Sequence, residues 1–136
     1  MISSYNSTIQ TVESGSAYVF DTNRIVTGCT VGHDAGSTTF TLYKPGYYYV
    51  TFNTTFTTEE TGIATVELRD GGVAVPGASG SETVTTAGDT KSVSFTTIVK
   101  VLPSCPAIDN TATLTLVSTG IDLTASISAL SITKLC

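Results

Sequence analysis

The chain has 136 residues, with 40% hydrophobic and 12% charged side chains, and its 11 acidic and 6 basic residues give a formal net charge of −5. This length fits one domain with a full hydrophobic core. The acidic balance argues against nucleic acid as a partner, because phosphate-binding surfaces depend on Lys and Arg. No apolar run approaches the roughly 20 residues that a spanning helix needs, and no polybasic segment suits a membrane surface, so we expect no membrane partner.

The N-terminal residues 1–16 are polar apart from a few apolar positions, and we expect an arm or a first edge strand there. They contain no basic region followed by an apolar core, so we expect no Sec-type leader. Residues 17–136 are rich in residues that favour strands, such as Thr, Val and Ile, and they show no helical periodicity of useful length. We therefore expect one all-β domain over residues 17–136.

The strongest strand signal follows the turn residues Lys44-Pro45-Gly46 and consists mainly of aromatic and β-branched side chains. Side chains alternate across a strand, so the even-numbered residues from Tyr48 to Phe52 share one face and Tyr47 and Tyr49 lie on the other. The first face suits the core of a β-sandwich. The second face is too aromatic for water alone, and we expect another sheet or a partner subunit to cover it.

Later segments continue the strand pattern. The run Asp70-Gly71-Gly72 predicts a hairpin, since Gly accepts positive φ, and Pro76 places the returning strand at a sheet edge or ends it. Long alternating strands are expected over residues 91–102 and 111–117. Between residues 121 and 135 the apolar positions change phase after Ser128-Ala129, which predicts a break or a bulge.

About eight to ten strands with regular turns are typical of a sandwich or a barrel. The expected core consists of inward apolar positions on the predicted strands: Phe40, Tyr48, Val50, Phe52, Phe95, Leu114 and Leu116.

No motif for catalysis emerges, and we expect no catalytic residue. The single histidine, His33, lies in a turn and lacks a nucleophile-elbow or oxyanion motif, so a solvated turn residue is the simpler interpretation. The Glu59-Glu60 pair resembles the two carboxylates of a glycosidase, but neighbouring residues of a strand point apart and a loop pair is usually solvated. A glycan-processing enzyme on a sandwich scaffold stays open as an alternative.

Metal binding and disulfide bonding are both weakly indicated. Three cysteines, Cys29, Cys105 and Cys136, have no zinc-type spacing, and they fit buried thiols, one disulfide plus a free thiol, or a link between subunits through Cys136. Acidic and amide side chains at predicted turns could together coordinate calcium, although no calcium-binding loop is present and turn formation is the simpler role. We expect no cofactor and no metal, with calcium as the one alternative. Its candidate ligands are the acidic and amide side chains at the predicted turns: Asp21, Asn23, Asp34, Asp70, Asp89, Asp109, Asn110 and Asp122.

The segment from Phe40 to Phe52 resembles the signature of the C1q/TNF-like superfamily. The second half of that signature has Phe, five residues, Gly, then Tyr and two aromatics at alternate positions. Phe40, Gly46, Tyr48 and Phe52 match, and Val50 replaces one aromatic. The first half departs from the signature.

A second likeness concerns residues 71–78, Gly-Gly-Val-Ala-Val-Pro-Gly-Ala. They resemble a hairpin in the C-terminal domain of BclA, a collagen-like spore-surface glycoprotein, and the order of later segments is similar over roughly residues 17–135. The chain differs from BclA because it has no Gly-X-Y repeat. Similar small domains occur in phages as trimeric decorations or fibre tips.

The resemblance implies a two-sheet jelly-roll sandwich of about ten strands that assembles as a homotrimer. It places residues 47–53 and 121–135 in the inner sheet, and with the unpaired aromatic face it leads us to expect these interface residues: Tyr47, Tyr49, Leu123, Ile127 and Leu130.

The resemblance also implies the function. We expect a non-enzymatic structural or recognition module on a virion or extracellular surface, in the leading case a phage decoration or fibre protein. Its partners would be a capsid or fibre protein, or a host-surface glycan. A bacterial spore or cell-surface domain, with this chain as a fragment of a longer protein, is the alternative.

Overall fold

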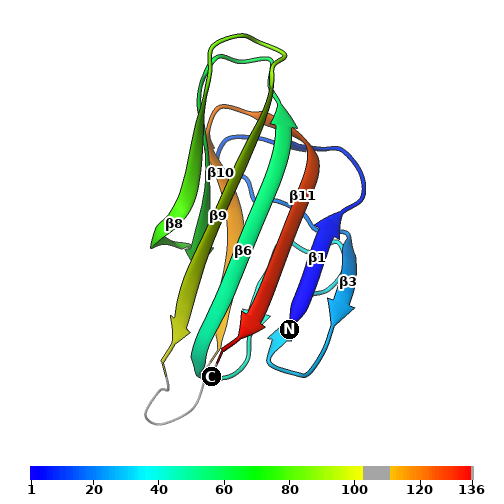
Figure 1. The fold of residues 1–136 in the computed structure, drawn as a ribbon, viewed down its shortest axis with the longest axis vertical. Coiled ribbons are helices and arrows are strands. Elements are labelled where there is room, and N and C mark those ends of the chain that lie inside the picture. Colours follow the sequence, from blue (N-terminus) through cyan, green and yellow to red (C-terminus); the bar gives the residue numbers. More distant parts are fainter. Residues whose placement is uncertain (103–110, 136) are drawn as a thin grey trace.

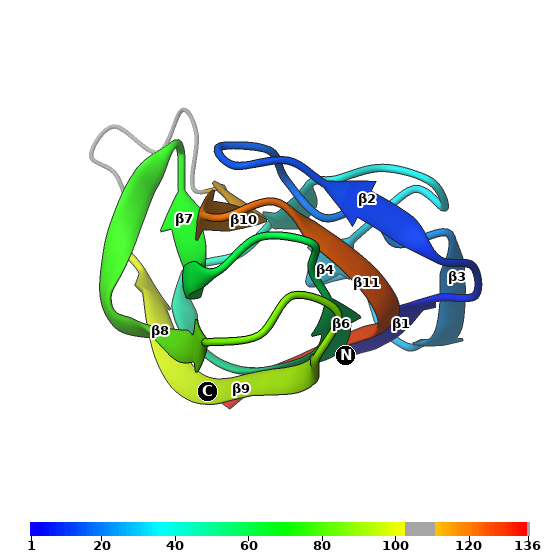
Figure 2. The same ribbon diagram turned by 90° about the horizontal axis from the view of Figure 1, so that it is seen from above.

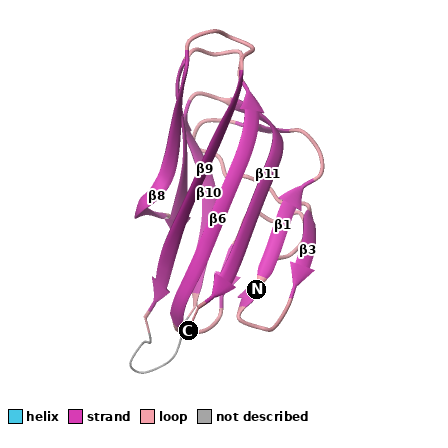
Figure 3. Cartoon of the chain, in the orientation of Figure 1, coloured by secondary structure: helices cyan, strands magenta, loops and turns pink. Residues whose placement is uncertain are grey.

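The computed structural model describes residues 1–102 and 111–135. Within them the chain forms eleven strands, and Figure 3 shows only strands and loops. No helix in the described ranges is long and apolar enough to cross a membrane.

The strands build two sheets that pack face to face (Figures 1 and 2). The front sheet faces the viewer in Figure 1. It has the order β3 (Thr22–Val26), β1 (Ile2–Asn6), β11 (Leu123–Lys134), β6 (Gly46–Thr57) and β9 (Thr90–Val101), and β2 (Gln10–Val12) also pairs with β11. The back sheet has the order β4 (Val31–Gly32), β5 (Phe40–Leu42), β10 (Ala112–Gly120), β7 (Gly62–Asp70) and β8 (Val73–Val84).

The pairing is nested in the sequence. The outermost pair is β1 with β11, followed by β5 with β10, β6 with β9, and the hairpin β7 with β8, and all of these pairs are antiparallel. A long hairpin folded over itself in this way is a jelly roll. The predicted all-β, two-sheet jelly-roll sandwich is therefore confirmed.

The core lies between the sheets and is built by the predicted alternation. Six of the seven expected core residues are at most 1% exposed, and Phe95 is half-buried against the same cluster. Edge-to-face aromatic contacts join the layers, with ring centroids 5.4 Å apart for Tyr18–Phe52 and for Phe20–Phe40. Tyr18 and Phe20 come from a segment between β2 and β3, which therefore helps to close the sandwich.

The N-terminal residues belong to the sandwich. β1 lies between β3 and β11, so this part of residues 1–16 is an interior strand and the expectation of an arm or edge strand is corrected there. Within residues 1–102 and 111–135, β2 pairs with β11 alone.

The turn chemistry of the β7–β8 hairpin acts as predicted. Asp70 pairs with Val73 across Gly71-Gly72, which have φ of 59° and 87°. Pro76 lies in β8, an edge strand, and there the register jumps from the Glu67–Ser79 pair to the Arg69–Ala74 pair. A proline donates no backbone hydrogen bond, so a bulge at an edge accommodates it.

A bulge in β11 sets which side chains face the core. Ala125 pairs with Phe56 and Ile127 pairs with Thr55, which leaves Ser126 as the extra residue. The predicted phase change is therefore present, but it occurs at Ser126, ahead of Ser128-Ala129. Leu123 and Leu130 are both 1% exposed and face the core. The expectation that they lie at a subunit interface is wrong, because the inward face of β11 is already filled by the back sheet.

Candidate subunit interface

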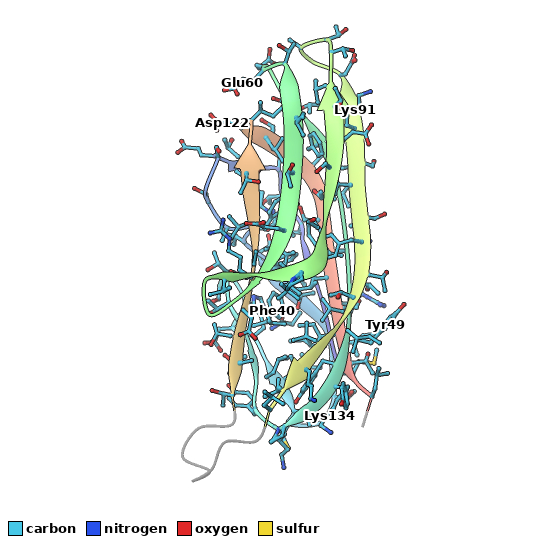
Figure 4. The ribbon with its side chains drawn as sticks, turned by 90° about the vertical axis from the view of Figure 1, so that its left-hand side faces the viewer. Phe40, Tyr49, Glu60, Lys91, Asp122 and Lys134 are labelled. Carbon is cyan, nitrogen blue, oxygen red and sulfur yellow. The ribbon has the colours of Figure 1, made fainter. Side chains whose placement is uncertain are left out.

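The outer face of the front sheet carries exposed aromatic side chains. Strand alternation turns Tyr48 inward and leaves Tyr47 and Tyr49 outward, with 42% and 40% of their surfaces exposed. Figure 4 shows Tyr49 pointing away from the sandwich, whereas Phe40 lies within it.

Neighbouring strands add apolar side chains to the same face. Ile98 of β9 pairs with Tyr49 and is 56% exposed, and Ile127 of β11 is 57% exposed beyond the Ser126 bulge. Tyr5 of β1 pairs with Ala129 and is 37% exposed. We call this set the tyrosine face: Tyr5, Tyr47, Tyr49, Ile98 and Ile127.

The tyrosine face extends along the sheet. Tyr47, Tyr49 and Ile98 cluster near one end, whereas Ile127 pairs with Thr55, six residues from Tyr49 and therefore about 20 Å away along β6. The structure thus places three of the five predicted interface residues on one outer face without bringing them into a single contact cluster. Tyr5 was missed in the sequence because it is an isolated aromatic residue in a polar segment, and Ile98 was missed because it lies out of phase with the inward positions Val99 and Val101 beside it.

Charge is scarce on this face. The outward positions of β6, β9 and the paired part of β11 are Thr, Ser, Asn, Ala, Tyr and Ile, and Lys100 is the exception. Its ammonium lies over the Tyr47 ring, 5.5 Å from the centroid. A cation held on an aromatic ring is compatible with a covered surface. The ring lowers the cost of covering this one charge but does not cancel it.

An apolar groove adjoins the tyrosine face at the edge where β8 and β9 meet. Its volume is about 280 Å³, and it is lined by Val73, Val75, Pro76, Ile98 and Val99, with the polar ends formed by Asp70 and Lys100. Val75 and Pro76 of its lining belong to the bulged part of β8. Ile98 belongs to both surfaces, so the groove and the tyrosine face form a continuous apolar strip.

The back sheet presents a different outer face. Glu67 and Arg69 form an ion pair 2.7 Å apart on β7, and the Thr65 and Ser81 hydroxyls bond at 2.9 Å. Residues 15–18 pair with β10 along its edge, and Val117 of β10 is buried. The two outer faces of the sandwich therefore differ in kind, and the front face is the one suited to a protein partner.

The His33 ring is fully engaged within the chain. Nδ1 lies 2.6 Å from Asn23 Oδ1 and Nε2 lies 2.9 Å from the Ser37 carbonyl oxygen, so both nitrogens face oxygen acceptors. The ring also stacks on Phe40, with centroids 4.1 Å apart. Both ring nitrogens are therefore occupied by contacts within the chain. Glu59 and Glu60 are exposed in the loop between β6 and β7, and Figure 4 shows Glu60 at the tip of the sandwich.

The turn carboxylates serve the backbone. The Ser7 hydroxyl and amide both donate to Asp21 and hold the pKa of that carboxyl below its usual value, and Asp122 accepts from the Ser14 amide at 2.7 Å. Across the described ranges, no three His, Cys, Asp or Glu side chains gather as metal ligands. Cys29 is free and exposed. Asp109, Asn110, Cys105 and Cys136 lie outside the described residues.

The nested pairing and the two-sheet core define the class of fold as a TNF-like jelly roll, and solved structures share it. Eiger TNF from S. frugiperda is 10% identical, with 99% of this chain and 92% of that chain covered and a TM-score of 0.75. Murine APRIL is 9% identical, with 98% of both chains covered and a TM-score of 0.63. The PRD1 vertex protein P5 is 14% identical, with 99% and 96% covered and a TM-score of 0.58.

No protein-family model and no curated protein matches the sequence. At these identities the structural likeness speaks for the fold. The TNF-like part of the expected resemblance is confirmed at that level, and the likeness to BclA stays a prediction.

Proposed function

We propose that the protein is a non-enzymatic homotrimer that serves as a structural and recognition module on a particle surface. The observation that carries this proposal is the tyrosine face, an extended outer sheet face with exposed Tyr and Ile side chains and a single charge. Contiguous exposed apolar patches mark protein contacts, and the part of the face that forms such a patch is the cluster of Tyr47, Tyr49 and Ile98, which continues into the groove.

The geometry favours a ring. The tyrosine face and the β8–β9 groove are different surfaces of one chain, so packing one subunit's tyrosine face on the next subunit's groove would be a heterologous contact, which gives a ring when the rotation between subunits closes. The C1q/TNF-like resemblance supports three as the number of subunits. The mechanism would be assembly through the apolar strip, with the loops at the ends of the sandwich and its free edges left to contact other molecules.

In the leading case the particle is a phage virion, and the protein is a decoration or fibre component that contacts a capsid protein, a fibre protein or a host-surface glycan. The jelly roll shared with a protein named as a vertex protein supports this case. A spore or cell-surface module is the second candidate, supported by the Gly-Gly-Val-Ala-Val-Pro-Gly-Ala hairpin and its edge bulge. Neighbouring genes for phage structural proteins or for a collagen-like chain would distinguish the two.

Light scattering of the purified protein tests the assembly. We expect a mass of about 42 kDa, three times the 14.1 kDa of one chain, and no change on adding reductant. A mass of one chain would overturn the proposal, because the tyrosine face would then be exposed to solvent. A trimer that dissociates in reductant would overturn the packing mechanism and assign the assembly to cysteine.

A further inference from the structure

A second, polar hollow lies at the sandwich edge where β3 of the front sheet approaches β4 of the back sheet. It measures about 70 Å³, and its lining includes His33, Asp34, Ser37, Thr39, Thr41 and Tyr43. We call it the β4–β5 pocket. Because β8 and β9 are the opposite ends of the two sheets, this pocket lies across the sandwich from the β8–β9 groove and from the cluster of Tyr47, Tyr49 and Ile98, and it stays accessible if these form the subunit contact.

The back of the pocket is rigid. The Asn23 side-chain amide donates to the His33 carbonyl at 2.7 Å. The side-chain oxygen of Asn23 contacts His33 Nδ1 and also accepts from the Ser4 hydroxyl at 2.6 Å. The His33 ring is therefore held between β3, the Phe40 ring and the Ser37 carbonyl. The turn that carries Asp34 is tied in as well, since the Gly36 amide donates to the Phe20 carbonyl at 2.9 Å. A binding site with fixed walls loses little entropy when it is occupied.

The side of the pocket is an aromatic ring held in place by a glycine. Tyr43 is 50% exposed, and its ring lies directly against Gly32. A Cβ atom at Gly32 would come within 2.6 Å of Tyr43 Cε2, so only glycine permits this ring position. The ring therefore offers a solvent-facing surface beside the polar hollow.

Several polar groups of the pocket are unused by the chain. In the described ranges the Asp34 carboxylate and the hydroxyls of Thr41 and Tyr43 make no side-chain hydrogen bond, whereas Ser37 and Thr39 share one at 3.1 Å. A carboxylate accepts hydrogen bonds, and a hydroxyl both donates and accepts. The combination suits a ligand with several hydroxyl groups and one apolar ring face.

We propose that the β4–β5 pocket binds one residue of a neutral glycan, with a sugar ring stacked on Tyr43 and its hydroxyls bonded to Asp34 and Thr41. The inference rests on the proposed recognition function and names its ligand class. A volume of 70 Å³ holds about two water molecules, so only a hydroxyl or hydroxymethyl group enters while the ring stays outside. Acidic sugars are disfavoured, because among the described residues Asp34 is the charged group of the lining and no Lys or Arg joins it.

A single sugar would bind weakly, with a Kd of about 1 mM or higher for a ligand of this size. A trimer would present three such pockets, and binding to a glycan-covered surface would gain from their combined action.

The test is a titration of the full ¹⁵N-labelled protein with methyl glycosides of glucose, galactose, mannose and N-acetylglucosamine, followed by amide chemical shifts. We expect saturable shifts for at least one sugar, confined to residues 32–34 and 37–43. Tyr43→Ala should weaken that binding about tenfold, the upper range of an aromatic contact, and Gly32→Ala should do the same by displacing the ring. Asp34→Asn should weaken it, and the matched exchange Asp89→Asn in another turn should leave it unchanged.

Shifts that survive Tyr43→Ala, or the absence of saturable shifts with all four sugars, would overturn the pocket. Tyr43→Phe keeps the aromatic ring, so sugar binding of wild-type strength in this variant would support the pocket. It would also show that the loss in Tyr43→Ala is due to the ring. The free sugars probe one pocket at a time, so this result does not depend on assembly. A trimer that binds no sugar would refute only the pocket, and a monomer that binds one would refute only the trimer.

Discussion

Ile63 and Ile127 are exposed to the same extent, 58% and 57%, on opposite outer faces of the sandwich. Ile63 lies on β7 of the back sheet, and Ile127 lies on β11 within the tyrosine face. The same substitution at each position therefore tests which outer face takes part in assembly, because residue type and exposure are the same.

If the tyrosine face is buried in a trimer, Ile127→Lys places an unpaired charge in each subunit contact and weakens it by about 3 kcal/mol or more. We expect this variant to dissociate into folded monomers at micromolar concentration, as measured by light scattering with circular dichroism as the check on folding. Ile63→Lys should keep the trimer mass. Equal masses for the two variants would contradict the assignment of the interface to the front sheet.

Glycine is required at Gly120 for two separate reasons. Its φ is +92°, and a Cβ atom there would clash with the Ile63 carbonyl oxygen. Gly88 has nearly the same φ, +88°, but nothing lies within 4 Å of its Cβ position. We expect Gly88→Ala to lower the free energy of unfolding by about 1–2 kcal/mol, the cost of the left-handed backbone, and Gly120→Ala to lower it by more, in urea titrations. A cost for Gly120→Ala no greater than that for Gly88→Ala would show that the β7–β10 ladder relaxes around the clash.

Tyr18 makes the stability of the fold sensitive to alkaline pH. It is fully buried, and its hydroxyl has no hydrogen-bond partner among the described residues. Burial raises its pKa from 10.0 to about 12, and the nearby Thr54 hydroxyl offsets the rise only in part, since the contact falls short of hydrogen-bond geometry. The folded state thus holds the Tyr18 proton more tightly than the unfolded state does.

The resulting stabilisation is complete below pH 10 and is lost as pH rises from 10 towards 12, with a loss of about 2–3 kcal/mol at the upper end. Urea midpoints measured across this range should fall for the wild type and fall less for Tyr18→Phe, which removes the titrating group. At neutral pH the same variant should not be destabilised, since no bond is broken. An equal alkaline loss in both proteins would assign the effect to other tyrosines, such as Tyr48, whose pKa is also raised by burial.

The sequence pattern predicts the fold where one face of a strand is clearly apolar. The alternation around Tyr48, Val50 and Phe52 and the hairpin at Gly71-Gly72 both correspond to the structure. The pattern fails in β11, where Leu123, Ile127 and Leu130 are all apolar and only three-dimensional packing decides which of them face inward. Buried hydroxyls add to the difficulty. Ser128 and Thr54 lie in the core, where the Thr54 hydroxyl donates to the Ile127 carbonyl and lies 3.4 Å from the Ser128 hydroxyl, and an apolar pattern does not mark such positions as buried.

The β4–β5 pocket could not be predicted from the sequence, also because it depends on three-dimensional packing. Its residues come from a turn and two short strands, and the clamp on His33 depends on Asn23 of β3, ten residues earlier. Neither a spacing nor a composition signals such an arrangement. The general expectation of a glycan partner could be stated from the sequence, but its place in the fold could not.

The Ser126 bulge predicts which deletions the chain tolerates. A bulge residue is an extra residue in one strand, so removing it restores a regular ladder and leaves every later side chain on its present face. In β11 the deletion of Ser126 keeps Ala125 inward and Ile127 outward, and it removes only the bond from the Ser126 hydroxyl to the Thr55 carbonyl. We expect a cost below about 1.5 kcal/mol in the free energy of unfolding.

Thr96 of β9 is the matched control, because it is also a small, exposed hydroxyl residue of the front sheet but lies in a ladder without a bulge. Deleting it shifts the rest of β9 by one position and turns Val99 and Val101 from the core to solvent. That change should cost about 3 kcal/mol or more. Urea denaturation of the two deletions should therefore give clearly different midpoints. Similar losses would mean that Ser126 fixes the register of β11, and that the phase change visible in the sequence is a requirement of the fold.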